Sequence, residues 1–348
     1  MRQLLDKNSV RFLSLAILAA LLLAVPVAWA GHNIWTPIGP AHTVVEALAL
    51  NPLAPDTLYA GTHGGVYKTT NGGADWTPAN SGLTQRQVYA LVLDPAAPDT
   101  LYVALVPGGV YKSTNEAASW APANTGITSS QVRALAVDPA TSGTLYAGTY
   151  GGGVFKSTNG AASWAPANTG LAGLRVRVLA IDPDAPATLY AGTEGGVFKS
   201  TNGGVSWTAK NNGLGSLTLR ALAIDPDDPG TLYAGTGGLG VFKSVDGGDH
   251  WQAASAGLTN GNVWAFAVNP QAPSILYAGT NGFGMFQSTD GGDSWAPFND
   301  GLTDLAIHAL AINPTEPDTL YAGTTSEGVF ARTSVQTYRV YLPGLRGD

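Results

Sequence analysis

The chain has 348 residues, including 45 glycines and 22 prolines, and only 12% of the residues are charged. It contains no cysteine, which excludes disulfide bonds and cysteine-ligated metals. The formal net charge of -7 argues against nucleic acid and anionic membrane surfaces as partners, because both favour basic patches.

Residues 1–30 have the pattern of a secretory signal peptide. Basic residues lie near the start, residues 12–23 are apolar, and Ala28-Trp29-Ala30 forms an Ala-x-Ala cleavage site. An uncleaved membrane anchor is the alternative. After cleavage the chain would carry a net charge of -9 and no stretch apolar enough to cross a bilayer. We therefore expect a secreted, periplasmic or cell-envelope protein.

One segment, clearest at residues 189–207, recurs along the rest of the chain. Its tyrosine and its tryptophan each return after 43 or 44 residues. The tyrosines are Tyr59, Tyr102, Tyr146, Tyr190, Tyr233, Tyr277 and Tyr321, and the tryptophans are Trp76, Trp120, Trp164, Trp207, Trp251 and Trp295. A repeat of this length made of short strands is typical of a β-propeller blade. The sequence predicts an all-β, seven-bladed propeller over residues 31–334, followed by a tail at 335–348.

Each repeat contains four strand-like runs. Asp-Pro or Asn-Pro ends the first run, because proline fixes φ and donates no hydrogen bond. Asn-Gly between the third and fourth runs indicates a hairpin, since both residues tolerate positive φ. In the third repeat we expect strands at 132–137, 144–149, 154–157 and 163–166.

The seventh repeat lacks its tryptophan. The missing piece lies at the other end of the chain, where Ile34-Trp35-Thr36-Pro37 has no repeat before it. We expect this N-terminal strand to complete the seventh blade, which removes the exposed edges of an open sheet. Residues 337–342 are the rival closing strand, but they lack the tryptophan motif.

Six turns match the Asp-box, Ser-x-Asp-x-Gly-x-x-Trp, although asparagine often replaces the aspartate. The paired positions are Asn71 with Trp76, Asn115 with Trp120, Asn159 with Trp164, Asn202 with Trp207, Asp246 with Trp251, and Asp290 with Trp295. On these copies the chain resembles the bacterial neuraminidase repeat superfamily of propellers. That superfamily includes sialidases, xyloglucan hydrolases, sortilin-type receptors and photosystem II assembly factor-like proteins. The Leu-Tyr-Ala-Gly-Thr strings are most similar to the assembly factor-like and unassigned secreted members.

The resemblance implies that the box is structural and remote from any active site. The residues agree: the Asn or Asp side chain can bond the turn's own backbone, glycine allows the bend, and tryptophan fills the space between blades. A calcium site at Asp246-Gly-Gly-Asp249 or Asp290-Gly-Gly-Asp293 is the alternative, but neither has the ligand spacing of a known loop. We expect no cofactor.

Positions that vary against the constant repeat are the candidates for a site. The variable position near the start of each inner strand is occupied by Glu46, Tyr89, Arg133, Arg177, Arg220, Trp264 and His308. The turn between the second and third strands also varies, and includes His63, Tyr150, Glu194, Leu239, Phe283 and Glu327. The resemblance implies that both sets surround one mouth of the central channel. Arginines could clamp a carboxylate, sulfate or phosphate, and the aromatic rings could stack on a sugar or a peptide side chain.

Two other interpretations of these residues stay open. In the first, the arginines pair with neighbouring acids such as Glu194 and only solvate the rim. Glu46, His63, His308 and Glu327 could together bind a metal, although pairs so distant in sequence are weak evidence.

Three functions follow. A non-catalytic, monomeric propeller that binds a glycan or protein partner at the channel mouth is the first. The second is a glycosidase, which the sequence favours less. No arginine after the signal segment precedes Arg86, so the early arginine element of sialidases is absent, and no two carboxylates can be placed at hydrolytic separation. The third is an assembly or scaffold factor at a membrane surface.

Overall fold

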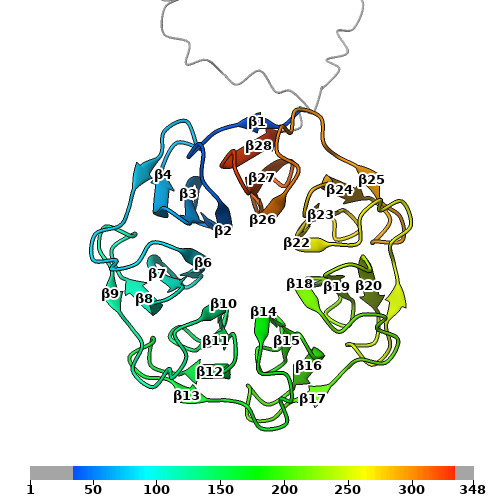
Figure 1. The fold of residues 1–348 in the computed structure, drawn as a ribbon, viewed down its shortest axis with the longest axis horizontal. Coiled ribbons are helices and arrows are strands. Elements are labelled where there is room, and N and C mark those ends of the chain that lie inside the picture. The colour runs from blue at the N-terminus through cyan, green and yellow to red at the C-terminus, as the bar shows by residue number, and fades with distance from the viewer. Residues whose placement is uncertain (1–33, 334–348) are drawn as a thin grey trace, which may run out of the picture.

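The computed structural model describes residues 34–333, which form seven four-stranded antiparallel sheets arranged as a ring (Figure 1). The prediction of a seven-bladed, all-β propeller is confirmed. In this part of the chain no helix is long and apolar enough to span a bilayer. The predicted signal peptide, the tail and the rival closing strand at 337–342 lie outside the described residues.

Four kinds of strand follow one another from the channel outward. The inner strands are β2 (Val45–Asn51), β6 (Val88–Asp94), β10 (Val132–Val137), β14 (Val176–Ile181), β18 (Leu219–Ile224), β22 (Val263–Val268) and β26 (Ile307–Ile312). The second strands are β3 (Ala54–Thr62), β7 (Ala97–Leu105), β11 (Leu145–Thr149), β15 (Leu189–Thr193), β19 (Leu232–Thr236), β23 (Leu276–Thr280) and β27 (Thr319–Thr324). The third strands are β4 (Gly65–Thr69), β8 (Gly109–Ser113), β12 (Gly153–Ser157), β16 (Gly196–Ser200), β20 (Val241–Ser244), β24 (Gly284–Ser288) and β28 (Val329–Thr333). The outer strands are two residues long: β5 (Thr77–Pro78), β9 (Ala121–Pro122), β13 (Ala165–Pro166), β17 (Thr208–Ala209), β21 (Gln252–Ala253), β25 (Ala296–Pro297) and β1 (Thr36–Pro37).

The N-terminal strand closes the ring, as predicted. β1 pairs with β28 through Thr36 opposite Ala331 and Pro37 opposite Phe330, and Figure 1 shows the two strands side by side. Trp35 is buried, and its Nε1 donates a 2.7 Å hydrogen bond to the carbonyl of Phe298 in the preceding blade. The first and last described segments therefore hold each other in one sheet.

The core lies between neighbouring blades. Tyr102 and Val110 of the second blade pack with Phe155 and Trp164 of the third in one apolar cluster. Close approach of blades explains the glycine of the Ala-Gly-Thr string: a Cβ on Gly148 would lie 2.6 Å from Cγ1 of Val176, on the next inner strand. A side chain at that position would push the blades apart.

The repeated turn after each third strand is fixed by its own side chains. In the third blade Ser157 Oγ accepts a hydrogen bond from the Ala161 amide, and Asn159 Oδ1 accepts one from the Ser163 amide. Trp164 Nε1 donates to the carbonyl of Ala123 in the previous blade at 2.8 Å. These contacts tie the turn to itself and each blade to its neighbour.

The lysines of the third strands differ from expectation. The sequence suggests solvated side chains at Lys68, Lys112, Lys156, Lys199 and Lys243. Instead each ammonium lies over a tyrosine ring and reaches the box turn of the next blade; Lys156 donates to the Gly203 carbonyl at 2.8 Å, beside Tyr146. The Tyr146 hydroxyl also donates to that carbonyl, and burial raises its pKa to about 12. The lysines therefore connect blades.

Trp35→Ala should lower the free energy of unfolding by about 3–5 kcal/mol, because it removes a buried indole at the closure. Urea unfolding would measure the loss. Leu53→Ala is the matched control, because Leu53 is 80% exposed and its loss should cost under about 0.5 kcal/mol. Equal effects of the two changes would contradict closure through Trp35.

The third box turn carries alanine in a left-handed conformation: Ala161 has φ 67° where the fourth box has Gly204 at φ 83°. Ala161→Gly should raise stability by up to about 1 kcal/mol, since relief of backbone strain exceeds the added chain entropy. The reciprocal change, Gly204→Ala, should cost about 1–2 kcal/mol, because its Cβ would also lie 3.2 Å from Tyr146. Thermal unfolding of both variants checks the signs, and a stabilising Gly204→Ala would refute the argument.

Candidate functional site

Every inner strand has a β-bulge at the position that the sequence singled out as variable. In β10 the ladder passes from Val132 opposite Thr149 to Ala134 opposite Gly148, so Arg133 is an extra residue. The corresponding register shift occurs in all seven blades. A bulged residue leaves the regular alternation, and its side chain is re-aimed.

The seven bulged side chains meet at one end of the channel, where they line a cavity of about 290 Å³ that we call the mouth cavity. Its lining residues are Glu46, Tyr89, Arg133, Arg177, Arg220, Trp264 and His308. In Figure 1 the strands that carry them, β2, β6, β10, β14, β18, β22 and β26, face the centre of the ring. The structure therefore brings together all seven of the variable inner-strand residues.

Two of the turn candidates, Tyr150 and Glu194, lie beside the mouth cavity and contact Arg177 or each other. Glu194 accepts hydrogen bonds from Arg177 at 2.6 Å, from Arg175 at 2.9 Å and from the Tyr150 hydroxyl at 3.1 Å. The hydrogen bonds from Arg175 and then Arg177 lower the pKa of Glu194 to about 2. Glu194 is thus an ionised carboxylate in a cage of two guanidinium groups and a phenol.

Sequence comparison of the repeats missed Arg175. Its position before the inner strand carries no arginine in the other copies at the same offset, and its partner Glu194 lies 19 residues away. The Arg-Val-Arg string was the available signal, because residues two apart in an extended chain point to the same side. Arg175 forms an isolated bridge with Tyr150, which brings it to the cage.

Arg133 and Arg220 behave differently from Arg177. Within residues 34–333 neither side chain forms a salt bridge or a hydrogen bond. The guanidinium of Arg133 lies 3.9 Å from the centre of the Tyr89 ring, and that of Arg220 lies 5.5 Å from the Trp264 ring. Burial, and then the charge of Arg177, lower the pKa of Arg220. The interpretation that the arginines merely pair with acids therefore holds for Arg177 alone.

On the other side of the mouth, Glu46 joins the first and last blades. Its two carboxylate oxygens lie within hydrogen-bonding distance of imidazole nitrogens, at 3.0 Å from His63 Nε2 and 3.1 Å from His308 Nδ1. Burial raises the pKa of Glu46, but the hydrogen bonds and charges of His308 and His63 outweigh it, and the net shift is downward. Among the described residues no group of three or more His, Asp or Glu side chains is placed to hold a metal. The alternative of a metal site formed by Glu46, His63, His308 and Glu327 therefore has no support in this part of the chain.

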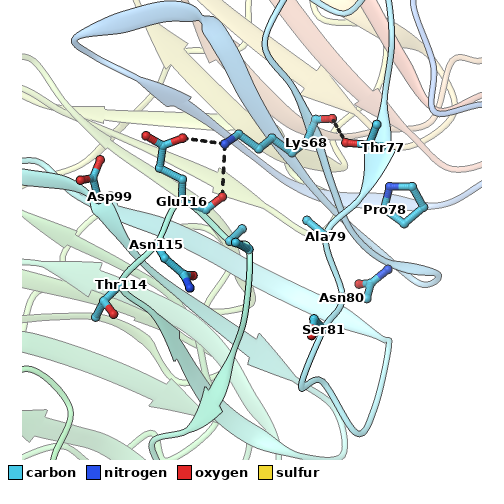
Figure 2. Close-up of a pocket in the computed structure, with 12 residues that line it drawn as sticks. Lys68, Thr77, Pro78, Ala79, Asn80, Ser81, Asp99, Thr114, Asn115 and Glu116 are labelled. Atoms are coloured by element: carbon cyan, nitrogen blue, oxygen red, sulfur yellow. Dashed lines mark hydrogen bonds and ion pairs between the residues drawn. The ribbon is translucent and has the colours of Figure 1, made fainter.

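A second, larger hollow of about 650 Å³ lies between the first and second blades, away from the mouth (Figure 2). There Lys68 Nζ binds the Glu116 carboxylate at 2.7 Å and the Glu116 carbonyl at 3.3 Å. A similar hollow of about 450 Å³ lies between the fifth and sixth blades, with Lys243 and Asp293 in its wall. Because it recurs between blades with the same lysine contact, we attribute this hollow to the repeat and not to a site.

The fold is shared with several solved structures. No family model matches the sequence, and no curated protein matches it. The GH74 xyloglucanase from Xanthomonas campestris is similar with a TM-score of 0.70 and 22% identity, over 87% of this chain and 54% of that one. YCF48 bound to D1 peptide is similar with a TM-score of 0.66 and 16% identity, over 87% of this chain and 98% of that one. The extracellular domain of a one component system from B. thetaiotaomicron is similar with a TM-score of 0.69 and 16% identity, over 86% of this chain and 40% of that one.

The chain spans about half the length of the GH74 proteins that it matches. At these identities the comparisons establish a common propeller fold. The proteins that share it include an enzyme, a protein bound to a peptide and an extracellular sensor domain.

The Glu194 cage should make stability depend on acid pH. A carboxylate whose pKa is lower in the folded state contributes stability above its unfolded pKa of roughly 4.3, and this is lost as pH falls towards 2. We expect Glu194→Gln to cost about 1 kcal/mol at pH 7 and almost nothing at pH 2, since the pair is partly exposed. Urea unfolding at both pH values measures this, with Glu316→Gln as control. A cost that did not change with pH would contradict the ionised cage.

Proposed function

We propose that this protein is a secreted, non-catalytic binding propeller that recognises an anionic ligand, carried by a glycan or a protein partner, at the mouth cavity. The observation that carries the proposal is the state of Arg133 and Arg220. Both line the cavity, both lie on aromatic rings, and neither has an acidic partner within residues 34–333.

The chemistry of the guanidinium group supports an anion. Each presents five donors in a planar fork that matches a carboxylate, sulfate or phosphate. The mouth and the adjoining cage carry four arginines against two carboxylates, Glu46 and Glu194, which is an excess of positive charge in a chain whose net charge is -7. An anionic ligand would complement this local charge.

The aromatic residues support a ligand with a ring or an apolar part. Tyr89 and Trp264 line the cavity, and Trp264 also packs on His308 with 4.3 Å between ring centres. Indole and phenol faces stack on sugars and on apolar groups with little loss of side-chain entropy. The fold's known members include one bound to a peptide, so a partner-borne ligand is also in keeping with the architecture.

The carboxylates at the mouth favour binding over hydrolysis. A glycosidase needs one carboxyl group that stays protonated near neutral pH beside a second that is ionised. Hydrogen bonds and charges hold the pKa of both Glu46 and Glu194 below the ordinary value. Both also already accept hydrogen bonds from neighbouring cations or imidazoles, which leaves neither available as an acid.

Arg133→Ala combined with Arg220→Ala should reduce binding to acidic members of a glycan and peptide array by at least about tenfold, because hydrogen bonds to charged groups are worth roughly 1.5–3 kcal/mol each. The melting temperature should change little, since neither arginine has a polar partner within the described residues. Titration of the wild-type protein and the variant over immobilised array ligands would measure the dissociation constants.

Two controls sharpen the test. Lys210→Ala removes a positive charge from the outer part of its blade, and should leave binding unchanged. Arg133→Lys with Arg220→Lys keeps the charge but loses the planar fork, and should give an intermediate affinity. Undiminished binding by the double alanine variant would refute the mouth as the site.

A further inference from the structure

The two carboxylates at the mouth differ in the charges that they face. Glu194 is held by the guanidinium groups of Arg175 and Arg177, at 2.9 and 2.6 Å. Glu46 meets no lysine or arginine within residues 34–333, where its only ion-pair partners are two imidazoles. Burial raises the pKa of Glu46, but the hydrogen bonds and charges of these imidazoles outweigh burial, so its carboxyl group is ionised at neutral pH. Glu46 therefore brings a negative charge to the mouth cavity that no permanent cation balances.

The order of the blades places this charge opposite the uncommitted arginines. The strand of Glu46, β2, is flanked by β26 and β6, whereas Arg133 on β10 and Arg220 on β18 lie on either side of β14. Figure 1 shows β2 across the centre of the ring from β14 and β18. Because all these bulged side chains line one cavity, the mouth cavity has an anionic wall and a cationic wall.

An aromatic residue separates the two walls on one side. Tyr89 lies on β6, between the strand of Glu46 and the strand of Arg133. The centre of its ring lies 3.9 Å from the guanidinium of Arg133 and 5.6 Å from the ring of His63, which contacts Glu46. The ring thus stands between a cation and an anion that would otherwise be neighbours.

Trp264 has the same position on the other side of the cavity, where β22 lies between β18 and β26. Its ring is 5.5 Å from the guanidinium of Arg220, and its centre is 4.3 Å from that of the His308 ring. Within residues 34–333 neither Arg133 nor Arg220 forms a salt bridge with Glu46. The charges of the two walls are therefore kept apart and cannot neutralise each other.

A ligand with one charge fits only one wall. A simple anion that binds the arginines shares a cavity of about 290 Å³ with the Glu46 carboxylate, which repels it. A simple cation is attracted by Glu46 and repelled by the arginines. A molecule that carries a negative group and a positive group, a few bonds apart, complements both walls.

The remaining hydrogen-bonding capacity of each wall indicates which groups these are. The planar fork of a guanidinium matches a carboxylate. Each oxygen of Glu46 contacts one imidazole nitrogen, so about two of its roughly four acceptor sites remain for a donor, and an ammonium group offers three N–H donors. The cavity lies at the lower end of the volume range of small-molecule sites, about 300–1,000 Å³.

We propose that the group recognised at the mouth cavity is an amino carboxylate, bound with its carboxylate at Arg133 and Arg220 and its ammonium group at Glu46. This inference rests on the proposed function, because it uses the same cavity and the same two arginines. It adds a positive group to the anionic one, and it makes Glu46 a residue that determines specificity.

The experiment is a calorimetric titration of the purified protein with ω-amino acids of increasing length, from glycine to 6-aminohexanoate. Unsubstituted carboxylates of matching length are the controls. At one intermediate length the amino acid should bind at least about tenfold more tightly than its matched carboxylate, because the ammonium group gains a charge-assisted hydrogen bond. Shorter and longer members should gain less, since the cavity fixes the separation of the walls. Equal affinities of the two series at every length would overturn the proposal.

Variants of Glu46 test its assignment. Glu46→Gln should abolish the advantage of the amino acids and strengthen the unsubstituted carboxylates, because it removes a negative charge from the cavity. Glu46→Asp keeps the charge but withdraws it by one methylene group, so the advantage should persist with its maximum at a longer amino acid. Glu327→Gln is the matched control, because Glu327 lies in a turn of the seventh blade and does not line the mouth cavity. An advantage that survives Glu46→Gln would refute the contact with Glu46.

The outcomes distinguish this inference from the proposed function. If carboxylates bind and the amino group adds nothing, the anion site stands and the amino carboxylate is refuted. If neither series binds, the amino carboxylate is refuted, and the array with the double arginine variant decides the proposed function by itself. Butylamine that binds as tightly as 4-aminobutyrate would refute the role of the arginines in both. Where the amino group does add affinity, comparison with the array separates a free small molecule from the same group carried by a glycan or a protein.

Discussion

Each blade of this protein can bury its apolar face only against the next blade, and this constraint shapes the whole ring. The seven tryptophans of the repeat motif, one in each blade, show it most directly. Each indole nitrogen donates to a backbone carbonyl of the preceding blade, from Trp76 to Ile38 through to Trp295 and Ala254. Trp35 makes the same contact with Phe298, so the series has no end. A ring with one contact missing would expose two sheet edges and an apolar face at once.

The same constraint explains why the residue type can differ from blade to blade at the mouth cavity. The residues on either side of the bulge, such as Val132 and Ala134, take part in the ladder and in packing, so their size is fixed by neighbours. The bulged residue Arg133 takes no part in the regular pairing. Substitution of a bulged residue therefore changes the stability of the sheet little, and seven such positions converge on one cavity. The fold thereby separates the residues that hold the ring from those that meet a ligand.

Much of this could be predicted because the repeats serve as their own comparison. The period gave the number of blades, the orphan tryptophan gave the closure, and the variable positions gave the lining of the mouth cavity. The contacts between blades could not be predicted in this way. Arg175, which meets Glu194 within the fourth blade, is positioned by a bridge to Tyr150 of the third blade, and Lys156 meets Gly203 in the box turn of the next blade. Such pairings depend on the spacing between sheets, which periodicity alone does not contain.

The central channel belongs to the same class of property, since it arises from the space that the seven inner strands leave between them. Leucines of the inner strands pack in the apolar clusters between blades, and Leu91 and Leu135 are buried there. Their counterparts Leu48 and Leu310 remain partly exposed in the same ring. The reason is geometric: a sheet packs on its neighbours along its faces, but its innermost edge faces only the centre. The unpaired edges of the innermost strands and the bulged side chains therefore border the channel, and these are the groups that a ligand at the mouth cavity would meet.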